Sequence, residues 1–168
     1  MENLPFVVSA GCILTTALTL FLLYKAANYS KTILTVSLAW LGLQATVALA
    51  GFYTVTDALP PRFTAALLPP LVVIVALFAT RRGRNFIDGL QVKWLTLLHV
   101  VRVPVELLLL WLALHKYLPL LMTFDGRNFD VLSGLTAPIV FYFGFVKRKL
   151  RRNFLLGWNF ACLALLLN

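Results

Sequence analysis

The sequence predicts an all-α fold, a polytopic bundle of transmembrane helices, on the basis of three observations. Of the 168 residues, 61% are hydrophobic and only 12% are charged. A soluble domain of this length has too large a surface-to-volume ratio to hide that much apolar side chain, so lipid must solvate the surplus. Apolar stretches long enough to cross a hydrocarbon core of about 30 Å recur along the chain. No stretch shows the alternation of a barrel strand, and backbone groups in lipid must be hydrogen-bonded internally, so the stretches are expected to be helices.

We expect six membrane spans within a single transmembrane domain that covers residues 1–168. The spans correspond approximately to residues 5–26, 32–54, 63–80, 94–115, 129–146 and 153–168. The last two are short for a full crossing, because a helix rises by only about 1.5 Å per residue. The sixth stretch also stops at Asn168 with no flanking charge. Either this helix is tilted into a thin region of bilayer or the natural chain continues past Asn168, and we favour a truncated chain.

The distribution of basic residues in the loops predicts the orientation of the bundle. One set of loops holds eleven Lys and Arg residues, and the other set holds three. Basic loops stay in the cytoplasm, so we expect the first set inside, the N-terminus outside and a plasma (inner) membrane location. The net charge of +9 is explained by these loops, and we expect no nucleic-acid partner. The expected cytoplasmic residues are Lys25, Lys31, Arg81, Arg82, Arg84, Lys93, Lys147, Arg148, Lys149, Arg151 and Arg152.

The tetrapeptide Gly-Arg-Asn-Phe occurs twice, beginning at Gly83 and at Gly126. We interpret both copies as turns through which the chain enters the membrane. In the first, the third helix ends at Arg82, Gly83 takes the left-handed position after it, and Asn85 caps a short interfacial helix with Asp88 three residues later. In the second copy the Asn caps the fifth helix, with an Asp in the first turn. An inverted repeat of the transporter kind is the alternative.

Three ionisable residues of the fourth span, His99, Arg102 and Glu106, fall within an arc of roughly 60° when the chain is helical. Charged side chains at this depth are costly in lipid, so this stripe must face protein or water. The spacing of four lets Arg102 and Glu106 pair along the helix. We expect either a ligand-binding or proton-relay site here, or a buried ion pair that locks this helix against its neighbours.

Polar residues elsewhere are candidate supporting partners for that stripe. Trp40 and Gln44 lie on one face of the second span, and Asn159 lies in the sixth. The outer loop after the fourth span carries four more candidates, which we interpret mainly as charge-balanced caps: Asp125, Arg127, Asn128 and Asp130. No spacing typical of a metal site, catalytic triad or phosphate loop is present, so we expect no metal, no cofactor and no catalytic residues.

The stretches 102–106, 122–130 and 134–138 (Arg-Val-Pro-Val-Glu, Met-Thr-Phe-Asp-Gly-Arg-Asn-Phe-Asp and Gly-Leu-Thr-Ala-Pro) resemble a group of uncharacterised bacterial multi-pass membrane proteins. The resemblance covers roughly the second half of the chain. It implies a bacterial plasma membrane and a total of six to seven helices, with a further helix after the sixth. It implies no activity, because none is assigned to that group.

Three hypotheses about function follow from the sequence. The first is a small transporter or proton-linked carrier that uses His99, Arg102 and Glu106. The second is a non-catalytic accessory or binding subunit whose polar stripe docks a partner helix, a lipid or a pigment. The third, an enzyme acting on a lipid-borne substrate, ranks last because a nucleophile is lacking. Besides the lipid bilayer, we expect a homo-oligomer or a membrane-protein partner, since six or seven helices make a narrow bundle.

Overall fold

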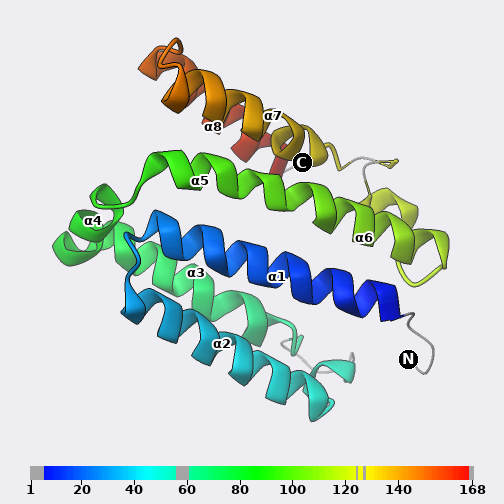
Figure 1. Cartoon of the computed structure of the whole chain (residues 1–168). Coiled ribbons are helices and arrows are strands. Elements are labelled where there is room, and N and C mark those ends of the chain that lie inside the picture. The colour runs from blue at the N-terminus through cyan, green and yellow to red at the C-terminus, as the bar shows by residue number, and fades with distance from the viewer. Residues whose placement is uncertain (1–5, 56–60, 124, 127, 167–168) are drawn as a thin grey trace. The chain divides into compact units, whose positions relative to one another are not determined.

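All regular elements are helical in the part of the chain that the structure describes, residues 6–55, 61–123, 125–126 and 128–166 of a computed structural model (Figure 1). The all-α fold class is therefore confirmed. The elements in chain order are α1 (Phe6–Ala26), α2 (Lys31–Leu49), η1 (Phe52–Thr54), α3 (Thr64–Ala79), α4 (Arg81–Asp88), α5 (Val92–Leu98), η2 (His99–Val101), α6 (Arg102–Leu114), η3 (Leu120–Met122), α7 (Val131–Phe141), η4 (Tyr142–Val146) and α8 (Arg152–Leu166). The η elements are 3₁₀ turns except η4, which is a π-helical turn.

Three helices are long and apolar enough to cross a membrane within the described residues. They are α1 with 21 residues, α2 with 19, and a 23-residue helix formed by α5, η2 and α6 together. A fourth candidate is the pair α3 and α4, which bends by 92° at the junction. Helix α7 with η4 is apolar but shorter. The described chain thus has the apolar helices that a membrane location requires, with three or four of them long enough to span.

The chain divides into two compact units. One contains α1 and everything from α5 to α8, and the other contains α2, η1, α3 and α4. The first unit is thus built from segments that are distant in sequence, whereas the second is one continuous piece of chain. The single domain expected from the sequence stays a prediction.

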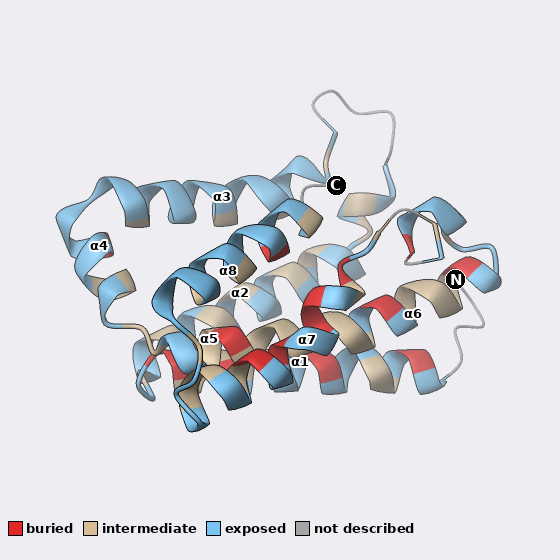
Figure 2. Cartoon of the chain, turned by 90° about the horizontal axis from the view of Figure 1, so that it is seen from above, coloured by how far each residue is buried: buried red, intermediate tan, exposed pale blue. Residues whose placement is uncertain are grey.

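In the first unit, α1 and the α5–α6 helix run antiparallel. The Gln91 N–H donates to the carbonyl of Ala26 at 2.8 Å, and the Lys25 Nζ lies 4.4 Å from the ring centre of Trp94. The end of α1 therefore lies beside the start of α5. Figure 2 shows the buried residues of this unit along α1, α5, α6 and α7.

Helix α7 packs through small side chains. Its buried residues are Ser133, Gly134, Ala137 and Val140, which recur at the spacing of one helix face. A Cβ added to Gly134 would lie 2.8 Å from Val103 Cγ2 and 3.1 Å from the carbonyl oxygen of His99. Small residues let helix backbones approach closely in membranes, and Gly134 serves that purpose here.

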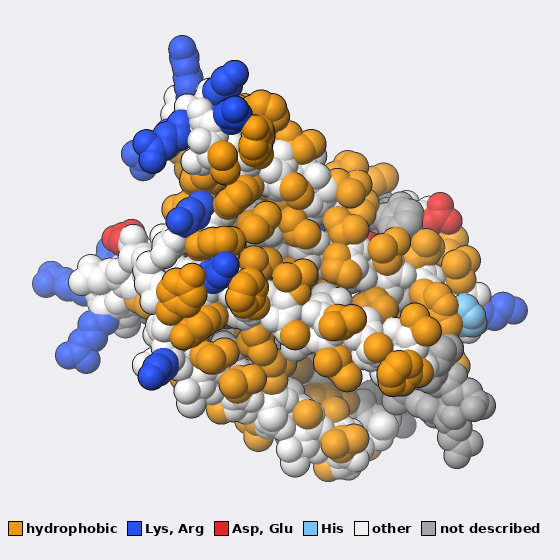
Figure 3. All heavy atoms as spheres, in the orientation of Figure 1, with side chains coloured by type: hydrophobic (Ala, Val, Ile, Leu, Met, Phe, Trp, Pro, Cys, Tyr) orange, Lys and Arg blue, Asp and Glu red, His pale blue; other side chains and the backbone are white. Residues whose placement is uncertain are grey.

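In the second unit, the long helices bury none of their described residues. Neither α2 nor α3 contains a buried residue. In Figure 3 apolar side chains cover most of the visible face, and most of the Lys and Arg side chains gather at one side of it. Lipid is the natural solvent for such a surface. Helix α2 ends at Leu49, earlier than expected, because Gly51 adopts a left-handed φ of 72° and starts the 3₁₀ turn η1.

The prediction for the first Gly-Arg-Asn-Phe copy is wrong in its details. Helix α3 ends at Ala79, and the cap of α4 is Thr80, whose hydroxyl accepts the Gly83 N–H at 3.1 Å. Gly83 lies inside α4 and has no left-handed conformation. Close packing requires a glycine at this position, since a Cβ there would collide with the carbonyl group of Leu77. A short helix does follow the third apolar stretch, as expected, but it begins at Arg81.

Candidate functional site

The loop after α6 folds back along that helix, so that α7 begins near the middle of the α5–α6 span. Arg102 lies close to the centre of the 23-residue helix Val92–Leu114. Turn η3 contacts α6, and the residues just before α7 bind side chains of α6 at this level. Helix α7 therefore covers only one half of the span, and irregular backbone lies beside the other half.

Arg102 connects three segments at this level. Its Nη1 donates to the carboxylate of Asp130, to Ser133 Oγ at 2.8 Å and to the carbonyl of Cys162 at 3.3 Å. Arg102 thereby joins α6 to the start of α7 and to α8. The side chains of Arg102 and Asp130 are 20% and 10% exposed, so their ion pair is largely shielded from solvent. Because this shielded ion pair is also hydrogen-bonded, it fixes the positions of the start of α7 and of α8 relative to α6.

Glu106 lies one turn further along α6 and binds the same returning loop. The amide Nδ2 of Asn128 donates to Glu106 Oε1 at 2.5 Å, and Glu106 is only 2% exposed. The other end of that amide, Asn128 Oδ1, accepts the Asp130 N–H at 3.2 Å. The side chain of Asn128 therefore links the carboxylate of Glu106 to the backbone of Asp130, whose carboxylate is paired with Arg102.

Further hydrogen bonds fix the shape of the returning loop. The Asn128 N–H donates to the carbonyl of Thr123 at 3.2 Å, and the fully buried Thr123 hydroxyl donates to the carbonyl of Leu120 at 2.8 Å. Ser133 Oγ donates to the carbonyl of Asp130 at 2.6 Å. The same three carbonyls also accept backbone N–H groups, from Gly126, Thr123 and Ser133 respectively, so the returning loop is hydrogen-bonded internally. Internal hydrogen bonding is the condition for irregular chain at membrane depth.

We use the name mid-span cluster for Arg102, Glu106, Asn128, Asp130 and Ser133. The spacing in the sequence makes Arg102 and Glu106 a possible pair on one helix, but the ion-pair partner of Arg102 is Asp130, which directly precedes the next helix. Asp130 occupies the N-cap position of α7, but its side chain makes no capping hydrogen bond and is instead buried against Arg102. Asn128 does bind the chain at the start of α7, but its amide group also reaches Glu106.

His99 makes its ring contact outside the mid-span cluster. Its ring packs edge to face on Trp158 of α8, with 5.0 Å between the ring centres. The Trp158 Nε1 in turn donates to Thr136 Oγ1 of α7 at 3.1 Å. The His99 Nδ1 is buried and has no hydrogen-bond partner among the described residues. His99 thus contributes to the packing of α7 and α8 against the span, one turn before Arg102.

The remaining candidates from the sequence are not brought to the mid-span cluster by any described contact. Asn159 donates to the carbonyl of Leu155 in its own helix at 2.8 Å, and Asp125 is exposed. Gln44 accepts the Tyr53 hydroxyl at 2.5 Å, and Trp40 lines a cavity with Pro69 and Pro70 of α3. Both belong to the second unit. Arg127 lies outside the described residues.

Sequence reasoning missed Ser133 and the carbonyl of Cys162 as partners of Arg102. Ser133 precedes Gly134, and the pair of small residues on an apolar helix was the only available signal that this face of α7 lies against another helix. A backbone carbonyl carries no sequence signal at all. Among the described residues, no group of three or more His, Cys, Asp or Glu side chains could hold a metal ion.

Comparison of the chain with known protein families, with characterised proteins and with solved structures found no match. The resemblance to bacterial multi-pass membrane proteins therefore stays a prediction.

Proposed function

We propose that this chain is a small proton-linked carrier of a bacterial plasma membrane, with the mid-span cluster as its binding and proton-accepting site. The observation that carries the proposal is the start of helix α7 beside the middle of a membrane-length helix, with Arg, Asp, Glu and Asn side chains gathered there. Interrupted helices that meet at mid-membrane, with polar groups at the break, are the usual construction of carrier binding sites.

Two groups of the cluster have distinct roles in this proposal. Glu106 accepts the proton, because it is a carboxylate buried at membrane depth and such groups are the usual relays of pumps and carriers. Arg102 binds the transported solute, a small anion that replaces Asp130 as the partner of its guanidinium. Both groups bind the loop 128–130, so a change at either one moves the same segment.

The physical link between proton and anion is the side chain of Asn128. An ionised Glu106 accepts the amide hydrogen bond from Asn128, whereas a protonated carboxyl group is a weaker acceptor and gains a donor of its own. Loss of this bond loosens the loop that presents Asp130 to Arg102. Protonation of Glu106 therefore favours release of Arg102 from Asp130 and exchange of its partner for the anion.

The topology that accompanies this proposal has the basic loops in the cytoplasm and the N-terminus outside. It is supported by the asymmetry of Lys and Arg between the loops. The six spans expected from the sequence would include the bent α3–α4 pair, the half-length α7 and the short α8. Shorter helices of this kind need a neighbouring protein surface or a thinned bilayer, which supports a homo-oligomer.

Proton uptake in liposomes tests the proposal. The purified chain is reconstituted with a trapped pH dye, and an inward gradient of chloride or of inorganic phosphate is applied. We expect anion-dependent acidification with the unchanged chain and none with Glu106→Gln, whose amide oxygen can still accept the Asn128 bond. Asp88→Asn is the matched control, since it removes an exposed carboxylate of α4. If Glu106→Gln and Asp88→Asn acidify at equal rates, Glu106 is not the proton acceptor.

A non-catalytic binding subunit is the second candidate, and one observation favours it. A single nitrogen of Arg102 already has three acceptors, as expected for a group that only holds helices together. In that case the unchanged chain acidifies liposomes no faster than liposomes without protein, although Glu106→Gln still folds. A stoichiometric partner that purifies with the chain in mild detergent would then support the binding role.

A further inference from the structure

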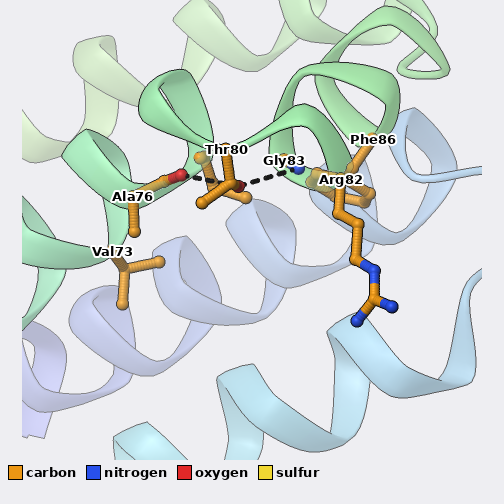
Figure 4. Close-up of a pocket in the computed structure, with 7 residues that line it drawn as sticks. Val73, Ala76, Thr80, Arg82, Gly83 and Phe86 are labelled. Atoms are coloured by element: carbon orange, nitrogen blue, oxygen red, sulfur yellow. Dashed lines mark hydrogen bonds between the residues drawn. The ribbon is translucent and has the colours of Figure 1, made fainter.

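The junction between α3 and α4 forms a groove with two chemically different parts. The helices meet at 92°, and a cavity of about 350 Å³ lies in the angle. Figure 4 shows side chains of α3 lying on one side of Thr80, and Arg82 and Phe86 of α4 lying on the other. The lining of the groove includes Val73, Ala76, Leu77, Thr80, Arg82 and Phe86. Its wall along α3 is apolar, and its rim on α4 is basic.

Helix α4 has the character of a helix that lies in a membrane interface. Its basic residues Arg81, Arg82 and Arg84 are exposed, whereas Phe86 and Ile87 are half-buried. Because α4 stands at about a right angle to α3, it lies along the bilayer surface when α3 crosses the bilayer. Basic side chains in that position attract anionic lipid headgroups.

We propose that this groove binds one anionic phospholipid of the surrounding bilayer. An acyl chain packs against Val73, Ala76 and Leu77, and the phosphate diester binds the guanidinium of Arg82. The two parts of the groove match the two parts of such a lipid, which is apolar in its tail and negative at its phosphate. Asp88 is the single acidic residue of α4, so the rim stays positive.

The donor for the phosphate is the Arg82 side chain. The hydroxyl of Thr80 is already engaged, because it accepts the Gly83 N–H at 3.1 Å and donates to the carbonyl of Ala76 at 2.8 Å. Arg82 makes no described ion pair, and its planar guanidinium can donate two parallel hydrogen bonds to a phosphate. This site lies entirely in the second unit and is independent of the proposed transport function.

Native mass spectrometry of the full chain tests the site. The protein is presented with equal amounts of phosphatidylglycerol and phosphatidylcholine in detergent, and the retained lipid is weighed. We expect one phosphatidylglycerol on the unchanged chain and about a fivefold loss of its retention in Arg82→Gln, the effect expected of one basic residue at an anionic surface. Arg82→Lys should retain most of the binding. Arg151→Gln, which removes an exposed charge from a different loop, should leave it unchanged.

A second variant tests the apolar half of the groove without altering charge. Ala76→Leu fills the wall and should reduce retention of the lipid, while circular dichroism and elution profile report that the variant is folded. Equal retention of the two lipids, or equal losses in Arg82→Gln and Arg151→Gln, would overturn the proposal. So would displacement of the lipid by inorganic phosphate at millimolar concentration, because that result would identify a free-anion site.

Discussion

The guanidinium of Arg102 in α6 is paired with the carboxylate of Asp130, which lies 28 residues later and immediately before α7. This contact connects the middle of a membrane-length helix to the start of a shorter one. An ion pair at this depth contributes little net stability, because desolvation of both groups offsets their attraction, but removal of one partner leaves the other charge uncompensated. The pair therefore specifies where α7 begins more than it stabilises the fold.

A double-mutant cycle measures the coupling between these two side chains. Arg102→Met and Asp130→Asn should each lower the free energy of unfolding by about 3–5 kcal/mol, since each leaves one buried group without its partner. The double variant should lose clearly less than the sum, because neither charge remains. Reversible unfolding in mixed micelles gives the coupling energy, with Arg84→Met as a control for loss of an exposed arginine. Additive losses would mean that the two side chains do not act as a pair.

Close contact between α7 and the 3₁₀ turn η2 is tested at Gly134. In Gly134→Ala the new Cβ would lie 2.8 Å from Val103 Cγ2 and 3.1 Å from the His99 carbonyl, so the Val103 side chain and the facing backbone must shift. Overpacking of this kind costs about 1–3 kcal/mol and should lower the melting temperature. Gly157→Ala in α8 is the matched control, because no atom lies within 4 Å of its added Cβ and alanine favours a helix. Equal melting temperatures for the two variants would contradict the close approach.

The cap of α4 is tested at Thr80. Thr80→Val keeps the shape of the side chain but removes the hydroxyl that accepts the Gly83 N–H, which should destabilise α4 by about 1 kcal/mol. Hydrogen exchange of a peptide covering residues 80–90 should then be faster. Thr46→Val is the control, since the described bond of that hydroxyl is to the carbonyl of Gly42 within its own helix. Unchanged exchange in Thr80→Val would show that the arginine-rich helix forms without this cap.

Much of the fold could be predicted from the sequence, because the backbone of an apolar stretch in lipid must form its hydrogen bonds internally, as a helix does. The helix α1 is expected over residues 5–26 and is observed at Phe6–Ala26, since an uninterrupted apolar run leaves the backbone no alternative to helical hydrogen bonds. Ends of helices are less predictable. The junction between α3 and α4 lies at Thr80 and not at Gly83, because the Thr80 hydroxyl accepts the N–H of Gly83 and so caps α4.

The two charged residues of α6 in the mid-span cluster were predictable from the sequence, but the groups that bind them were not. The cost of charge at membrane depth singles out Arg102 and Glu106 whatever the tertiary structure. The helical spacing of four favours a bond between them, but spacing along one helix carries no information about a loop that returns from beyond Leu114. Asp130 and Asn128 look like helix caps in the sequence for that reason. The available clue to the ion pair was that Arg102, a charged residue within an apolar span, needs an acidic partner, and that Asp130 lies at the start of the next span.

The orientation of the bundle gives the last prediction, which depends on the loop charges. Cys12 and Cys162 are first replaced by Ala, and one new cysteine is introduced, by Lys116→Cys after α6 or by Lys149→Cys before α8. A membrane-impermeant maleimide added to intact cells should label the first variant, because the loop after α6 is expected outside. The second variant should be labelled only after the membrane is permeabilised. Labelling of the Lys149→Cys variant in intact cells would reverse the orientation, and would place Arg82 and the rest of the α4 rim on the outer surface of the membrane.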